Sequence, residues 1–405
     1  MTSFDTSPQL GVWRALLALA VVFVMLATSG WTALRGERES TPFRAAVSAW
    51  EHGRLHGRHL PDPQSAPERL ARFFAALSDT DRAHLAHRYP LVVGNMNGAP
   101  VGLRYRANRV ALTQARTVER RRMHDPRLTP AGQYEAGRRM HRLESLLTPG
   151  RNILAFSPDG SGRVAEVFGD LTRAERVSVV VPGVDTDLLT FQRTRRRYSA
   201  PVGMAESLYR AERAIGPGTP TAVIAWADYT APSGIGMDAA TAMRAERGAV
   251  RLDALVRALP GRAPVSLFCH SYGSVVCGVA AHRLPDRVTD IAVAGSPGMR
   301  AEKATHLRTS ARVWAMRDAD DWIQDVPYLE LGGLGHGADP VSAAFGARVL
   351  SADGAHGHAG YFEPGTESLW NFAEIGVGAY SSVHCADDAG GCRAGLSRTD
   401  PVGRA

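Results

Sequence analysis

A serine near the middle of the chain stands between two apolar runs. Ser271 lies in the segment Cys269-His270-Ser271-Tyr272-Gly273-Ser274, after a predicted strand at 265–269 and before a predicted helix. A strand–turn–helix with small residues two positions from the serine on each side is typical of a nucleophile lifted out of a sheet. Gly273 meets this size requirement, and Cys269, which replaces the usual first glycine, is compact. The alternative is a serine that only caps a helix.

Acidic residues follow a later predicted strand at 312–316. A serine hydroxyl needs a base to take its proton, and an acid must orient that base. In sheets of this kind the three groups follow in the order serine, acid, histidine. We favour Asp321, because an aspartate that leads into the apolar pair Trp322-Ile323 suits a turn back into the fold. Asp318 and Asp320 remain alternatives.

Several histidines follow the acidic loop, and the base should lie on a loop after the last strand. His358 comes shortly after a short predicted strand at 349–351, and we favour it. His356, two residues away, is the main rival. His336 is a further candidate for the base. The alternative is a structural role for His336, as a loop histidine hydrogen-bonded to the backbone.

An acyl-transfer site also needs N–H groups that stabilise the oxyanion. The backbone N–H of Tyr272, directly after the serine, is one candidate. The second is the N–H of Val184, which follows the predicted strand 177–181, and Gly183 would allow a close approach of the backbone. Trp226–Tyr229, at the end of the neighbouring strand, would line the pocket or pack in the core.

The composition and motifs of the chain limit the kinds of binding partner that we expect. The net charge is +7, but Lys303 is the only lysine and arginines cluster only at 120–122 and 193–197, so no nucleic-acid partner is expected. The chain has no HExxH, no CxxC pair, no Walker loop and no GxGxxG after a strand. We therefore expect neither a metal nor another cofactor, and a small-molecule acyl substrate as the partner.

The elements that must position these residues begin near residue 150. Predicted strands and helices alternate from there, which favours a mainly parallel sheet with helices on both faces and ligands at the carboxyl ends of its strands. A predicted hairpin joins 153–156 to 164–168, and one long helix is predicted at 239–259. Helices are predicted before residue 150, with a tight turn at 92–98 between them.

Residues 15–34 are twenty residues without a charge, flanked by Arg14 and Arg35. This length at about 1.5 Å per residue matches a bilayer core of about 30 Å, so we expect a single-pass anchor; a cleaved signal peptide is the alternative. The main domain is then expected outside the cytoplasm, although the flanking charges do not decide the side. In that location Cys385 and Cys392 could pair.

Taken together, Cys269–Ser274, Gly295-Ser296-Pro297-Gly298, His336–Pro340 and Tyr361–Gly365 resemble an actinobacterial α/β-hydrolase family of uncharacterised function. Leu77-Ser78, Tyr89-Pro90, Gly94-Asn95, Gly98 and Ala107-Asn108-Arg109 resemble the helical region that precedes the hydrolase domain there. The resemblance covers roughly residues 65–380. It implies a serine hydrolase with Ser271, His358 and an acid at 318–321, and it implies no substrate.

The expected architecture is therefore an α/β-hydrolase fold, preceded by a helical region and one transmembrane segment. The expected divisions are 1–36 for the anchor, 37–149 for the helical region, 150–380 for the hydrolase and 381–405 for the tail. The expected activity is that of an esterase, lipase or amidase. The alternatives are a membrane-tethered scaffold without catalysis and a peptidase of the same fold.

Overall fold

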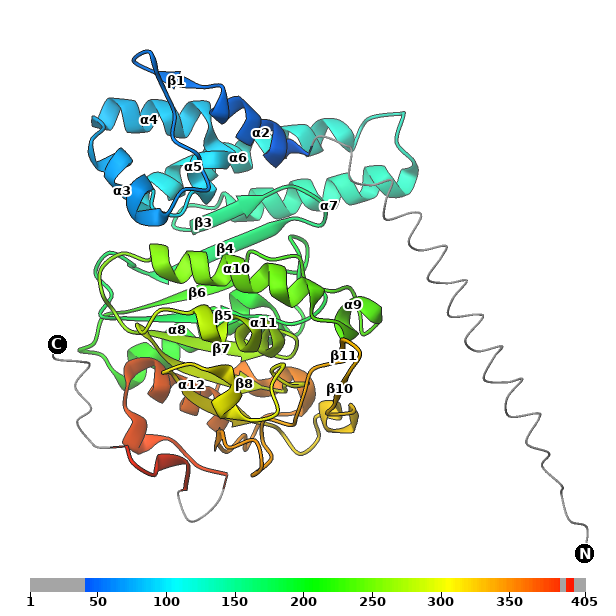
Figure 1. Cartoon of the computed structure of the whole chain (residues 1–405). Coiled ribbons are helices and arrows are strands. Elements are labelled where there is room, and N and C mark those ends of the chain that lie inside the picture. The colour runs from blue at the N-terminus through cyan, green and yellow to red at the C-terminus, as the bar shows by residue number, and fades with distance from the viewer. Residues whose placement is uncertain (1–40, 387–390, 397–405) are drawn as a thin grey trace, which may run out of the picture. The chain divides into compact units, whose positions relative to one another are not determined.

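A computed structural model describes residues 41–386 and 391–396 of the chain, and one compact unit begins at Ala46. Its centre is an eight-stranded sheet with the order β12-β9-β8-β7-β5-β6-β4-β3 (Figure 1). The strands are β3 (Asn152–Ser157), β4 (Arg163–Gly169), β5 (Arg176–Val181), β6 (Thr221–Ala227), β7 (Val265–His270), β8 (Val288–Ala294), β9 (Arg312–Met316) and β12 (Arg348–Val349).

All strand pairs from β6 through β12 are parallel, whereas β4 runs antiparallel to both β3 and β6. The predicted mainly parallel sheet and the predicted hairpin are thus confirmed. β7 lies between β5 and β8 in the middle of the sheet. The carboxyl ends of these parallel strands meet at one edge, which is where ligands bind in open sheets of this class.

Alternate residues of the central strands feed two different cores. Along β5, Val177, Val179 and Val181 belong to one apolar cluster, and Val180 belongs to the other. Because side chains alternate across a strand, this pattern requires cover on both faces. Helices α10 (Met243–Ala258) and α11 (Gly273–Ala280) supply the first cluster, and α8 (Pro201–Ile215) and α12 (Glu367–Val377) supply the second.

The helical region before the sheet has a core of its own, built around Trp50, Leu70 and Phe74. Asn108 ties this region to the sheet, because its side-chain amide donates to the carbonyls of Gly94 and Ile153, each at 3.0 Å. The helices are α2 (Pro42–Glu51), α3 (Pro67–Ala75), α4 (Asp79–Arg88), α5 (Pro90–Asn95), α6 (Val101–Arg122) and α7 (Pro130–Leu146), with a small hairpin of β1 (Arg54–Leu55) and β2 (Arg58–His59).

Two local predictions were wrong. The predicted turn at 92–98 is largely helix α5. Pro90 occupies the first position of this helix, where proline is favoured, so it begins a helix here. The helix predicted at 239–259 is split into α9 (Met237–Ala240) and α10. The break falls at Thr241, which forms an antiparallel bridge with Leu334. Leu334 belongs to β11 (Leu334–Gly335), which pairs with β10 (Glu330–Leu331).

The transmembrane part of the expected architecture is corrected. No helix within 41–386 and 391–396 is long and apolar enough to cross a bilayer. The predicted anchor at residues 15–34 lies outside the described residues, so the structure supports neither this anchor nor the extracytoplasmic location that depended on it. Cys385 and Cys392, whose pairing the sequence left open, form a disulfide. The domain boundaries at 36, 149 and 380 stay predictions.

Candidate active site

Ser271 sits on a sharp turn between β7 and α11. Its φ of +56° is in the left-handed region, which is unusual for a residue with a side chain. Its N–H donates to the carbonyl of Ala294 at 3.0 Å, so the end of β8 helps to hold the turn. A residue kept in this conformation costs on the order of 1–3 kcal/mol, and such strain is concentrated at functional sites.

Two glycines allow the chain to pack closely around this turn. A Cβ on Gly273 would lie 2.2 Å from the carbonyl oxygen of Val181, so α11 can approach β5 only with glycine here. A Cβ on Gly183 would lie 2.6 Å from Cβ of Ser271. The loop after β5 therefore lies directly against the serine, as the sequence predicts for these two positions.

Cys269 forms a disulfide with Cys277, which sequence reasoning missed. The bond joins the end of β7 to the second turn of α11, and both residues are fully buried. The signal that could have predicted this disulfide was the separation of eight residues between the two cysteines across a strand–turn–helix. Cys269, which replaces the usual glycine, is thus part of a disulfide that cross-links the two sides of the turn at Ser271.

Ser271, His358 and Asp321 are joined in one hydrogen-bonded series. Nε2 of His358 lies 2.8 Å from Oγ of Ser271. Nδ1 of the same ring lies 2.8 Å from Oδ1 and 3.1 Å from Oδ2 of Asp321. An ionised carboxylate only accepts, so Nδ1 carries the proton and Nε2 is left to accept from the serine hydroxyl. His358 lies on η6 (Gly357–Phe362), and Asp321 precedes η5 (Trp322–Asp325).

The carboxylate of Asp321 is completely buried and has several donors. Burial alone would raise its pKa. The hydrogen bonds from His358, Tyr361 and the N–H of Ile323 more than offset burial, and the pKa of Asp321 is lowered. The hydroxyl of Tyr361 donates at 2.5 Å, and burial followed by the charge of Asp321 raises the pKa of this tyrosine. The carboxylate therefore stays ionised beside the histidine.

The alternative acids and histidines either have other hydrogen-bond partners or are exposed. Asp318 accepts from the N–H groups of Asp320, at 2.9 Å, and Gly357, at 3.1 Å, so it ties the acidic loop to the histidine loop. Asp320 and His356 are exposed. His336 is buried, and its Nε2 lies 2.6 Å from the carbonyl oxygen of Ala239.

Two further residues shape the site and were not assigned from the sequence. Nε2 of His270 lies 2.6 Å from the carbonyl oxygen of His358, so the residue before the serine holds the loop of the histidine. Burial lowers the pKa of His270 to about 3, which keeps its ring neutral and its N–H available. Gly295 has a φ of +55°, and a Cβ there would lie 2.7 Å from Oδ2 of Asp321.

Tyr272 and Val184, the residues predicted to supply the oxyanion donors, line the same cavity as Ser271. Among the described residues, the N–H groups of Tyr272 and Val184 donate to no protein acceptor. Tyr229 is buried, stacks on Trp226 and donates its hydroxyl to the carbonyl of Pro182 at 2.6 Å. It packs in the core, as one of the two predictions had it, and it fixes the backbone just before the Gly183–Val184 peptide.

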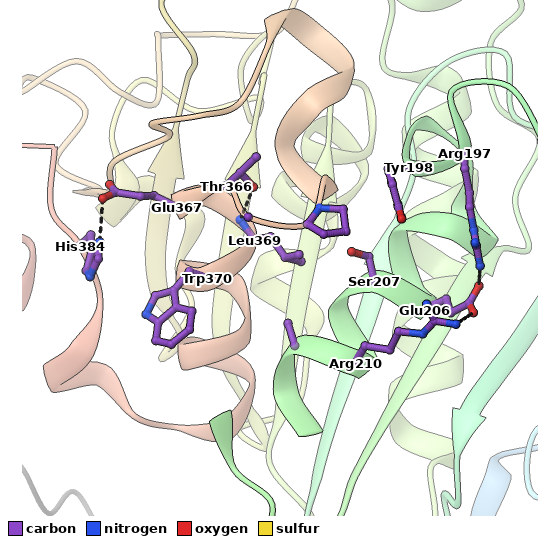
Figure 2. Close-up of a pocket in the computed structure, with 13 residues that line it drawn as sticks. Arg197, Tyr198, Glu206, Ser207, Arg210, Thr366, Glu367, Leu369, Trp370 and His384 are labelled. Carbon is purple, nitrogen blue, oxygen red and sulfur yellow. Dashed lines mark hydrogen bonds and ion pairs between the residues drawn. The ribbon is translucent and has the colours of Figure 1, made fainter. Parts of the chain in front are cut away.

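A cavity of about 460 Å³ opens at Ser271, and Val184 and Tyr272 also line it. A second cavity, of about 550 Å³, lies at α8 and α12 (Figure 2). There Glu206 pairs with Arg197 and Arg210, and His384 pairs with Glu367. The hydroxyl of Ser207 in this second cavity is buried and, within the described residues, has no hydrogen-bond partner. Of these two serines, only Ser271 has its hydroxyl within hydrogen-bond distance of a histidine in the described residues, at 2.8 Å from Nε2 of His358.

Residues 157–331 match the model of an alpha/beta hydrolase family. The chain contains an alpha/beta hydrolase domain. The matched segment of this domain includes Ser271 and Asp321, and His358 lies beyond it. An uncharacterized protein of Mycobacterium tuberculosis is similar to the chain, with 27% identity over 377 residues. The alignment covers 79% of this chain and 57% of that protein, so the chain spans little more than half the length of this relative.

Two solved structures with low sequence identity are similar to part of the chain. A dienelactone hydrolase from Anabaena variabilis is 17% identical, with a TM-score of 0.36, over 58% of this chain and 99% of its own. A predicted CIB-like hydrolase from Thermoplasma acidophilum is also 17% identical, with a TM-score of 0.36, over 56% of this chain and 96% of its own.

Proposed function

We propose that the chain is a serine hydrolase that cleaves an ester or a related acyl substrate through an acyl-enzyme. The observation that carries this proposal is the series of hydrogen bonds from Ser271 through His358 to Asp321, with distances of 2.8 Å at both steps. A nucleophile and a base within hydrogen-bond reach, with the base oriented by a third group, form the arrangement used in acyl transfer.

The chemistry follows from these contacts. Oγ of Ser271 attacks the acyl carbon while its proton passes to Nε2 of His358, and Asp321 stabilises the resulting imidazolium. The N–H groups of Tyr272 and Val184 stabilise the negative charge on the former carbonyl oxygen. The imidazolium then gives its proton to the leaving alkoxide or amine. Water, deprotonated by His358, attacks the acyl-enzyme and releases the acid and the free serine.

Covalent labelling tests the nucleophile directly. A fluorophosphonate probe, read by intact mass and peptide mapping, should form one adduct, on Ser271. The adduct and all ester turnover should be lost in Ser271→Ala. Ser207→Ala is the matched control, since this serine is also buried beside a cavity but has no histidine partner within the described residues.

Either of two results would overturn the proposal. One is a folded protein that takes up no probe, which would favour a scaffold that retains the fold without catalysis. The other is full ester turnover in Ser271→Ala. A peptide panel beside the ester panel separates an esterase from a peptidase.

A further inference from the structure

The cavity at Ser271 is lined almost entirely by apolar side chains. No carboxylate, arginine or lysine is among its lining residues. Its ionisable groups are His336, whose pKa is lowered by burial, and Tyr272, whose pKa burial raises to about 12, so both favour the neutral form. A volume of about 460 Å³ falls in the range of roughly 300–1,000 Å³ for small-molecule sites. The space beside the nucleophile thus suits a hydrocarbon group.

The mouth of this cavity is apolar as well. Leu331 is 77% exposed and Ile235 is 76% exposed, yet both also line the cavity. We call the exposed apolar residues that line this cavity the rim; they are Ile235, Trp322, Leu329, Leu331 and Leu334. Exposed side chains of this size are rarely gathered in one place on a soluble surface without a binding role.

The rim comes from two chain segments that are fastened to the site. Thr241 bridges to Leu334, which joins the segment around α9 to the β10–β11 hairpin. The hydroxyl of Tyr272 donates to the carbonyl of Thr241 at 2.8 Å, and His336 bonds to Ala239. The residue after the nucleophile therefore holds the rim in place, and the rim and the cavity form one continuous apolar surface.

The charge around the rim limits the kinds of lipid surface that the rim can bind. The segments 235–243 and 322–336 contain three acidic residues and no arginine or lysine, although the whole chain has a net charge of +7. Asp238 pairs with Arg244 at 2.8 Å, and Glu330 pairs with Arg300 at 2.7 Å. A surface of this kind gains nothing from an anionic membrane, since binding to anionic lipids depends on surplus basic residues.

We propose that the site takes esters with an apolar acyl chain of medium to long length, and takes them from the surface of an uncharged or zwitterionic lipid aggregate. The acyl chain occupies the cavity, and the rim contacts the lipid surface. This inference rests on the proposed function, because Ser271 must be the nucleophile that meets the ester carbonyl at the inner end of the cavity.

Chain length is the first test. The full-length chain is assayed with p-nitrophenyl acetate, butyrate and octanoate below their aggregation limits. Each methylene that enters the cavity should raise kcat/KM, by up to about fourfold if it is fully buried. We expect at least a tenfold rise from acetate to octanoate. In the double variant Leu331→Ser/Leu334→Ser the octanoate-to-acetate ratio should fall at least fivefold, whereas Val118→Ser, an exposed valine on α6, should leave it unchanged.

Lipid binding is the second test. Ser271→Ala protein is sedimented with phosphatidylcholine vesicles, with and without added phosphatidylglycerol. We expect binding to phosphatidylcholine that phosphatidylglycerol does not strengthen. The rim substitutions, introduced into the same full-length chain, should weaken binding several-fold, and Val118→Ser should not. Any contribution from the rest of the chain is common to all variants and cancels.

The outcomes separate this inference from the proposed function. Probe labelling on Ser271 together with equal kcat/KM on all three esters would overturn the inference and leave the nucleophile in place. Vesicle binding that requires phosphatidylglycerol, or that is unaffected by the rim substitutions, would also overturn it. A dimer in light scattering that is lost in the rim variant would assign the rim to a second copy of the chain instead. Failure of labelling itself would overturn the proposed function.

Discussion

The hydroxyl of Tyr361 donates a hydrogen bond of 2.5 Å to Oδ2 of Asp321, the carboxylate oxygen that lies farther from the His358 ring. The same hydroxyl accepts the N–H of Asp318 at 3.0 Å. Tyr361 lies three residues after His358, so one short segment supplies both the proposed base and a donor that fixes the proposed acid. We therefore expect the tyrosine to act as a positioning residue rather than as a catalytic one.

We expect Tyr361→Phe to lower kcat/KM on soluble esters roughly tenfold, because a hydrogen bond to a buried charge contributes about 1.5–3 kcal/mol. Tyr380→Phe is the matched control. Its hydroxyl also donates to a buried carboxylate, that of Asp290, at 2.8 Å, but away from Ser271. Both variants should lose stability in urea unfolding, and only Tyr361→Phe should lose activity. Equal activity in the two variants would contradict the positioning role.

Gly295→Ala should abolish most activity. The added Cβ would lie 2.7 Å from Oδ2 of Asp321 and 3.1 Å from Nδ1 of His358, so the acid and the base must move apart. A displacement of this kind can cost about a hundredfold in rate. Gly261→Ala separates this effect from backbone strain, because Gly261 also has a positive φ, of +62°, but has nothing within 4 Å. Rates of probe labelling on the two purified variants measure the difference, and similar rates would argue against the crowding.

Glu212 predicts a pH-dependent stability. It is buried on α8, where it accepts from Ser178, and burial raises its pKa from the ordinary value of 4.5 to about 8. Between these values the unfolded chain has lost this proton and the folded chain retains it. Raising the pH therefore favours unfolding, and the contribution present below pH 4.5 is lost as the pH rises through about 8.

We expect Glu212→Gln to raise Tm at pH 8 by about 2–4 °C and to have a smaller effect at pH 5. Calorimetry at several pH values checks this, with Glu246→Gln, an exposed glutamate on α10, as the control. A Tm difference between wild type and Glu212→Gln that does not change with pH would show that Glu212 titrates normally.

The disulfide between Cys269 and Cys277 should stabilise the folded chain. Closing a loop with a sequence separation of eight removes chain entropy worth about 2.5 kcal/mol from the unfolded state. We expect the double variant Cys269→Ala/Cys277→Ala to lose about this free energy of unfolding and to label more slowly at Ser271. The tail pair offers a control, since Cys385→Ala/Cys392→Ala removes a disulfide with a separation of seven, away from the turn. Slower labelling in the tail variant would show that the effect is not local.

The sheet and the three central residues could be predicted because each signal is local in the sequence. Ser271, Asp321 and His358 each follow a recognisable strand, and parallel strands bring their carboxyl ends to one edge. His270 and Gly295 could not be assigned, since their roles depend on what faces them: the carbonyl of His358 for the first and the carboxylate of Asp321 for the second. Helix α5 was missed for a similar reason, because its contact with β3 through Asn95 spans 61 residues of sequence.

Part of the apolar rim, Leu331 and Leu334, lies on the β10–β11 hairpin, apart from the segments that hold Ser271, Asp321 and His358. Asp318 and Tyr361 fasten the acidic loop to the loop of His358, and His270 fastens the latter loop to the serine turn. The hairpin is attached to the segment around α9, which Tyr272 and His336 contact. We therefore expect that residues of the β10–β11 hairpin can be exchanged without disturbing the proposed proton transfer. Under divergence or in directed evolution, substrate range should change first in the hairpin, while the residues that fasten the two loops should be replaced only together.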